Sequence, residues 1–193
     1  YWFTDNSLFA VRFANIIFSL ITIFASYRIA LHLFARPEAD NDDPDVSQNL
    51  ASRVALSAAF TLAIYPNHVA YTSLLFMEPY FMALMSGGVA LLLAQRRMTD
   101  ISAGIIFAMA VLTRPQVLFV PLIVIGWRWL SCQSESRETF VKPLQRIVLV
   151  YSLIMLLIIP WLYRNHTVFG EFVFISTNGG FNLYLGNNPQ AQG

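Results

Sequence analysis

The chain has 193 residues, of which 56% are hydrophobic and only 12% charged, and its mean hydropathy is +0.56. The charged share is about half of that in soluble domains, so the composition argues against an ordinary water-soluble fold. The net charge of +1 provides no global attraction to nucleic acid, and a single cysteine, Cys132, excludes an intrachain disulfide.

The apolar residues are gathered in long runs, and the first run extends from Leu8 to Phe34. It is long enough to cross the roughly 30 Å of hydrocarbon in a bilayer. The segment from Glu38 to Asn49 is rich in aspartate and is expected to form an exposed loop. It contains two Asp-x-Asp patterns, but it lacks the Gly and the distal Glu of a calcium-binding loop. A solvated connector without a metal is therefore the favoured interpretation.

Five further apolar runs follow in chain order. They extend over Ala51–Tyr65, Met77–Ala94, Ile101–Leu112, Val117–Leu130 and Ile147–Leu162. The short apolar segment Val69–Phe76 is expected to be interfacial or re-entrant. The runs on either side of Arg114-Pro115 are expected to be half-depth or tilted helices, and Ser131–Gln145 is expected to be a polar loop.

The composition changes after Tyr163, where Asn and Gly become frequent. The alternating segment Phe172–Ile175 predicts a short strand or an extended segment. The clusters Asn178–Gly180 and Gly186–Pro189 are typical of turns, whose glycines let the backbone approach a ligand. We therefore expect a transmembrane region over residues 1–165 and the start of an outer-face loop region over 166–193.

The basic residues indicate an orientation. If the first run crosses from outside to inside and each later run reverses, nine of the twelve Lys and Arg residues lie on the inner side. These nine are Arg28, Arg36, Arg53, Arg96, Arg97, Arg128, Arg137, Lys142 and Arg146. Basic residues favour the cytoplasmic side of short loops, which predicts a multi-pass protein of the inner or plasma membrane. Arg12, Arg114 and Arg164 remain on the outer side, where orientation does not require them.

Two outer residues are candidates for a binding role. Glu78 stands at the start of a predicted helix, where it is either a structural cap or a functional carboxylate. Arg114 lies at a helix break and needs an anionic or carbonyl partner. Glu78, exposed backbone carbonyls and a lipid phosphate are the alternatives, and the planar guanidinium suits bidentate phosphate binding. Plain snorkelling of Arg114 to the interface is the competing interpretation.

The segment Arg164-Asn165-His166 follows the last apolar run. Arg164 can anchor that helix at the interface together with Trp161 and Tyr163, as aromatic belts do. His166 could act as a base, but it has no evident partner in the sequence and is expected to be structural.

The C-terminal part of the chain contains a series of short motifs: Pro160–Asn165, Phe169-Gly170, Ser176–Gly180, Asn182-Leu183 and Gly186–Pro189. Together they resemble a signature of bacterial GT-C glycosyltransferases, the enzymes related to protein O-mannosyltransferases and to the lipid A aminoarabinose transferase. Weaker matches appear in the expected order upstream: Val11-Arg12, Tyr65-Pro66, Met77–Pro79 and Leu112–Pro115.

The resemblance implies an all-α integral membrane protein, a multi-span helical bundle with a short extended segment at its outer face. Such an enzyme transfers a sugar from a polyprenyl-phosphate carrier to a glycan, lipid or protein acceptor at the outer face, within the membrane lipids and without cofactor, metal or nucleic acid. The expected substrate-binding residues are Glu78, Arg114, Arg164, Asn165, Asn178 and Asn187.

The catalytic aspartate of this family lies in the first outer loop. Asp5 is in the wrong place relative to Arg12 to be that residue, so the base is expected upstream of Tyr1 and the chain is expected to be inactive by itself. A transporter or flippase of lipid-linked sugars is one alternative, although we find one helix break and no internal repeat. A non-catalytic scaffold is the other, and in that case replacing the candidate residues would affect only folding.

Overall fold

A computed structural model describes residues 8–34, 44–74, 76–131, 138–176 and 178–188. Within these ranges the regular structure consists of eight α-helices and one 3-10 helix, which confirms the predicted all-α class. The elements are α1 (Leu8–Phe34), α2 (Pro44–Ile64), α3 (Pro66–Ser73), α4 (Glu78–Leu93), α5 (Arg97–Thr113), η1 (Pro115–Phe119), α6 (Val120–Ser131), α7 (Glu138–Phe169) and α8 (Asn178–Asn187).

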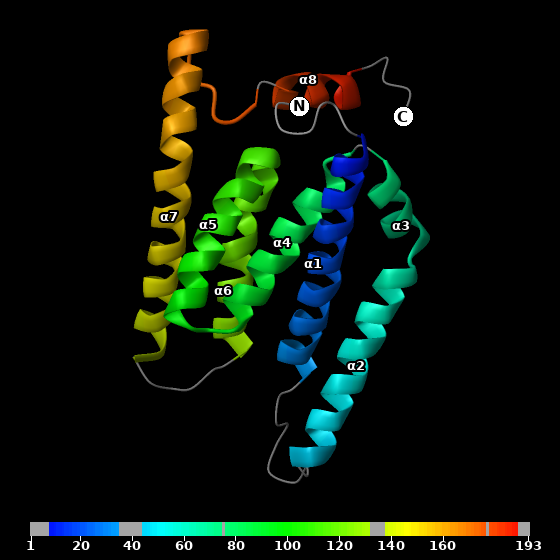
Figure 1. The fold of residues 1–193 in the computed structure, drawn as a ribbon. Helices are drawn as coiled ribbons and strands as arrows, with labels where there is room; N and C mark the ends of the chain where they lie inside the picture. Colours follow the sequence, from blue (N-terminus) through cyan, green and yellow to red (C-terminus); the bar gives the residue numbers. More distant parts are fainter. Residues whose placement is uncertain (1–7, 35–43, 75, 132–137, 177, 189–193) are drawn as a thin grey trace.

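The helices α1, α2, α4, α5, α6 and α7 lie side by side, and each of these six runs opposite to the one before it (Figure 1). Helix α8 lies across one end of this bundle, where α4 begins and where α5 and α7 end. We call this end the α8 end. We call the opposite end, where α4 ends and α5, α7 and α2 begin, the basic end, because most of the Lys and Arg residues lie in its half of the bundle.

The core lies between α4, α5, α6 and α7, and α1 packs between α4 and α2. Phe107 of α5 is the largest of the fully buried side chains. Helix α5 approaches α7 closely at Gly104, since a Cβ atom there would lie 3.0 Å from the Leu153 Cβ atom. The centre of the bundle is therefore packed tightly enough that single side-chain changes alter its stability.

Two adjacent glycines of α4 provide a test of this packing. A Cβ atom added at Gly88 would lie 2.8 Å from Cε2 of Phe107, and the buried ring has no room to move away. We expect Gly88→Ala to lower the free energy of unfolding by about 1–3 kcal/mol. Thermal unfolding of the purified protein measures the effect.

Gly87 supplies the matched control, because a Cβ atom there meets nothing within 4 Å. Alanine is the better helix former, so Gly87→Ala should be neutral or should stabilise by up to about 1 kcal/mol. Equal melting temperatures for the two variants would contradict the described contact between α4 and α5.

Several helices extend beyond the apolar runs that predicted them. Helix α2 begins at Pro44, inside the segment Glu38–Asn49 that was expected to be a loop, while Asp40–Asp43 lie outside the described residues. Helix α7 begins at Glu138, inside the predicted loop Ser131–Gln145, and continues past residue 165 to Phe169. The proposed boundary at residue 165 thus falls within one helix. Hydropathy detects only the apolar part of a helix. Glu, Lys, Gln and Arg are good helix formers, so they can extend a helix beyond its apolar run.

The C-terminal predictions were partly wrong. Phe172–Ile175 was predicted to be a short strand or an extended segment. It is irregular and not a strand, since no strand occurs among the described residues and the segment has no ladder to join. The turn signals around Asn178 and Asn187 lie in helix α8 instead. Gly170 does mark a chain reversal, because its φ of +70° ends α7 in the left-handed region that glycine adopts readily. Further upstream, the apolar segment after Pro66 lies largely in a short helix, α3.

Helix α1 and residues Val141–Phe169 of α7 are long and apolar enough to cross a membrane. Their most apolar windows are only 22% and 17% buried, which is unlike the core helix of a soluble protein. Phe24 on α1 and Leu156 on α7 are among the exposed apolar side chains. The described chain therefore leaves much of the apolar surface of these two helices uncovered.

Candidate functional site

An ion pair joins two of the predicted site residues at the α8 end. Arg114 Nη2 donates a hydrogen bond to Glu78 Oε1 at 2.9 Å, across 36 positions of sequence. The guanidinium carbon of Arg114 also lies 4.9 Å from the centre of the Phe81 ring, within cation–π range. Of the partners considered for Arg114, Glu78 is therefore one that the structure places in contact with it.

Local backbone structure explains how these residues meet. Arg114 is extended, with φ −141° and ψ 104°, because the following Pro115 disfavours the helical region at its neighbour. Glu78 occupies the first turn of α4, where the helix dipole stabilises a carboxylate, and Pro79 beside it loses no helical hydrogen bond. The end of α5 and the start of α4 therefore present opposite charges to each other.

This pair remains accessible from outside. The side chain of Arg114 is 51% exposed and that of Glu78 is 33% exposed. Within the described residues, the other guanidinium nitrogens of Arg114 make no hydrogen bond. The hydrogen bond to Glu78 orients the guanidinium of Arg114, and the carboxylate cancels its charge at long range. The remaining N–H donors of Arg114 can still bind a second anion at close range.

A second cluster surrounds Arg164 near the end of α7. The guanidinium carbon lies 4.9 Å from the centre of the Trp161 ring, and Nη1 donates to Asn165 Oδ1 at 3.5 Å. These side chains border a shallow hollow of about 270 Å³. Its remaining lining residues are Phe169, Val173, Ile175 and Ser176. The interfacial anchor predicted for Arg164 and Trp161 is thus accompanied by a small concave surface.

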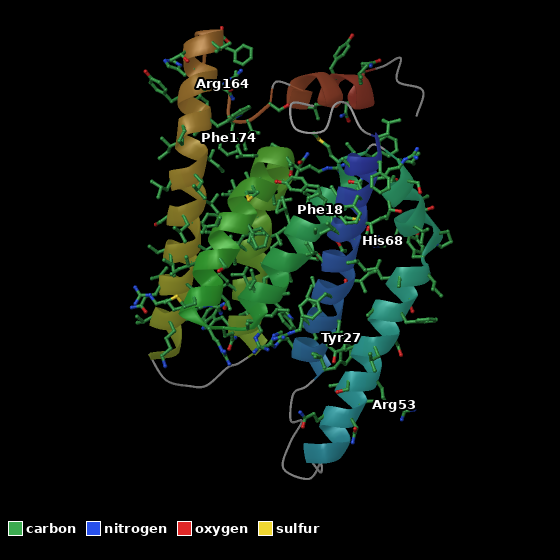
Figure 2. The ribbon with its side chains drawn as sticks, in the orientation of Figure 1. Phe18, Tyr27, Arg53, His68, Arg164 and Phe174 are labelled. Carbon is green, nitrogen blue, oxygen red and sulfur yellow. The ribbon has the colours of Figure 1, made fainter. Side chains whose placement is uncertain are left out.

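The hollow exists because the chain folds back along α7 after Gly170. Asn165 is buried, and its Nδ2 donates to the carbonyl of Val173 at 3.3 Å. Trp161 Nε1 donates to the carbonyl of Ile175 at 3.4 Å. Figure 2 shows Arg164 near the end of α7, with Phe174 of the returning segment beside the same helix. Asn165 therefore positions this segment with the amide group that was predicted to bind substrate.

The two remaining predicted residues belong to helix α8. Asn178 and Asn187 lie at opposite ends of α8, separated by about 14 Å of helix. Asn187 Nδ2 donates to the carbonyl of Leu183 within the same helix, at 2.9 Å. The side chain of Asn178 lies outside the described residues. The two segments that were expected to form turns are thus parts of one short helix.

The α8 end thus contains two separate groups of candidate residues. Arg114 and Glu78 belong to the ends of α5 and α4, and neither borders the hollow beside Arg164. Both groups combine an arginine with an aromatic ring. Among the described residues, no group of three or more His, Cys, Asp and Glu side chains could hold a metal ion.

Sequence reasoning missed the more buried of the two ion pairs found among the described residues, which lies at the basic end. Arg146 of α7 binds Asp100 of α5 through two hydrogen bonds, Nη2 to Oδ1 at 2.7 Å and Nε to Oδ2 at 2.8 Å. Nη2 also donates to the carbonyl of Leu92 at 2.6 Å. The only sequence signal was an acidic residue, Asp100, in the first turn of an apolar helix. Such a residue does not indicate which cation binds it, and Arg146 lies 46 positions away.

Comparison with known proteins assigns no relationship: no family model, curated protein or solved structure matches the chain. The function is therefore argued from the arrangement of the residues.

Proposed function

We propose that the protein crosses the membrane several times, with the basic end in the cytoplasm. The uncovered apolar surfaces of α1 and α7 support this placement, as do the alternating directions of the helices. The described basic residues in the half of the bundle at the basic end are Arg28, Arg53, Arg96, Arg97, Arg128, Lys142 and Arg146. Only Arg12, Arg114 and Arg164 lie toward the α8 end, which is the distribution that the positive-inside rule predicts.

We propose further that the protein is a membrane glycosyltransferase that moves a sugar from a polyprenyl-phosphate carrier to an acceptor at the outer face. The observation that carries this proposal is the half-exposed guanidinium of Arg114, which Glu78 and Phe81 hold at a helix break of the α8 end. The resemblance to GT-C enzymes includes these same positions, Met77–Pro79 and Leu112–Pro115.

The proposed chemistry requires a fixed positive group at this face. When the sugar leaves, the carrier keeps its phosphate, and negative charge grows on the phosphate oxygen in the transition state. Preorganised donors aimed at such an oxygen stabilise the transition state without a metal. Arg114 supplies a planar donor fork of this kind, and Glu78 and Phe81 restrict its rotation.

Binding of the free carrier tests this role without the complete reaction. We expect Arg114→Gln to weaken the binding of polyprenyl phosphate to the protein in nanodiscs by about tenfold or more, the loss typical of a charged hydrogen bond. Quantitative native mass spectrometry can measure the affinity. Arg12→Gln is the matched control, since it removes the same charge from α1 at the same end of the bundle. Equal affinities of the two variants would remove Arg114 from the proposed site.

A transfer assay then separates the proposed function from its alternatives. Membranes that carry the protein together with the outer loop expected upstream of Tyr1 should move a labelled sugar from the polyprenyl-phosphate donor to an outer-face acceptor. Arg114→Gln should reduce the transfer rate more than Arg12→Gln at equal expression. Movement of the lipid-linked sugar across the membrane without transfer would identify a transporter instead. Absence of both activities would favour a scaffold.

A further inference from the structure

A larger hollow, of about 530 Å³, opens at the basic end of the bundle. It lies between the start of α5 and the first turns of α7, at the end opposite to Arg114. Its polar lining residues are Gln95, Arg97, Asp100, Lys142, Gln145 and Arg146. The proposed transfer reaction uses none of them.

The charges of this hollow do not cancel. Asp100 and Arg146 neutralise each other through their bidentate contact, and their side chains are only 4% and 18% exposed. Arg97 and Lys142 are both exposed, and neither forms an ion pair with an acidic residue whose side chain the structure describes. The lining therefore carries an excess of two positive charges around a buried, neutral floor.

The backbone adds to the attraction for an anion. Arg97 is the first residue of α5, a helix of 17 residues whose N-terminal end carries partial positive charge. Gln95 adopts a left-handed conformation, with φ 55°, in the turn that joins α4 to α5. The amide side chain of Gln95 lines the hollow, as does that of Gln145 of α7. Cations, amide donors and a helix N-terminus together suit the oxygens of a phosphate group.

We propose that this basic hollow binds the phosphate of an anionic lipid headgroup from the cytoplasmic leaflet. The inference rests on the proposed membrane placement and not on glycosyl transfer. Cytoplasmic leaflets are rich in anionic lipids, and basic pockets between membrane helices at that face bind their headgroups. The phosphate could also come from a soluble anion, so the experiment includes inorganic phosphate.

The test uses the protein in phosphatidylcholine nanodiscs, with and without phosphatidylglycerol. Native mass spectrometry counts the phosphatidylglycerol molecules that stay bound after lipid ejection. We expect retention of phosphatidylglycerol in preference to phosphatidylcholine. The double variant Arg97→Gln/Lys142→Gln should bind phosphatidylglycerol about 25-fold more weakly, from a loss of about fivefold for each cation. The variant leaves the Asp100–Arg146 pair intact, so the hollow should keep its shape.

Arg53→Gln is the matched control, because Arg53 is an exposed cation of α2 that does not line the hollow. It should retain phosphatidylglycerol as the parent protein does. Equal retention by the double variant and the parent would overturn the proposal. Displacement of the lipid by millimolar inorganic phosphate would assign the hollow to a soluble anion and overturn the lipid source. Unchanged affinity of the double variant for polyprenyl phosphate would show that this site is independent of Arg114.

Discussion

Replacing Asp100 by leucine is expected to lower the free energy of unfolding by about 3–5 kcal/mol, the cost of leaving a buried charge without its partner. The side chain of Arg146 is only 18% exposed, so water cannot replace the lost carboxylate fully. Its remaining protein partner is the carbonyl of Leu92, which accepts a single hydrogen bond at 2.6 Å. Thermal unfolding in detergent, followed by circular dichroism, measures the loss.

Two further variants distinguish this effect from a general loss of a surface contact. In Asp100→Leu/Arg146→Met both charges are absent, and the protein should regain much of the lost stability, since apolar pairs often replace buried ion pairs without cost. Glu78→Gln breaks the other ion pair, whose side chains are 33% and 51% exposed, and should change stability by less than about 1 kcal/mol. Similar losses in Asp100→Leu and Glu78→Gln would show that the Asp100–Arg146 pair is not buried.

Replacing Phe107 by alanine is expected to cost about 3 kcal/mol or more. The ring is fully buried where α4, α5, α6 and α7 meet, and it fills the space above Gly88. Its removal leaves a cavity that the neighbouring helices cannot close without losing other contacts. This packing loss persists in a bilayer, where association of helices depends on van der Waals contact.

Phe119→Ala provides the control for Phe107→Ala, because Phe119 is of the same size but 63% exposed. Its replacement should change stability by no more than about 0.5 kcal/mol, as is usual for surface positions. A comparable loss in both variants would indicate that α5 does not lie at the centre of the bundle. Chemical unfolding with two independent probes also reveals whether the bundle unfolds as one unit.

The length of apolar runs predicted most of the fold because each run must be buried or covered by lipid. The first run and α1 have the same limits, Leu8 and Phe34. The prediction was least accurate where polar residues extend a helix, as in the six residues of α2 before Leu50. It also failed at α8, since Asn and Gly mark turns in general but are tolerated in a short helix.

The candidate site was only partly predictable. The sequence indicated that Arg114 needs an anion and offered Glu78 as a partner, because both residues flank helix ends on the same predicted side. It contained no comparable signal for Asp100 and Arg146. Their contact depends on the rotation of α5 against α7, two helices that approach each other closely at Gly104. Periodicity within one helix does not specify such a rotation.

The length of helix α7 determines how far Arg164 lies from the level of Arg114. Its 32 residues extend over about 48 Å, whereas the 17 residues of α5 extend over about 26 Å from the same end of the bundle. In the proposed membrane placement, Arg114 at the end of α5 would lie near the lipid boundary, while Arg164 would lie farther out along α7. A carrier that stays within the membrane and an acceptor that arrives from water would thus meet arginines at different heights.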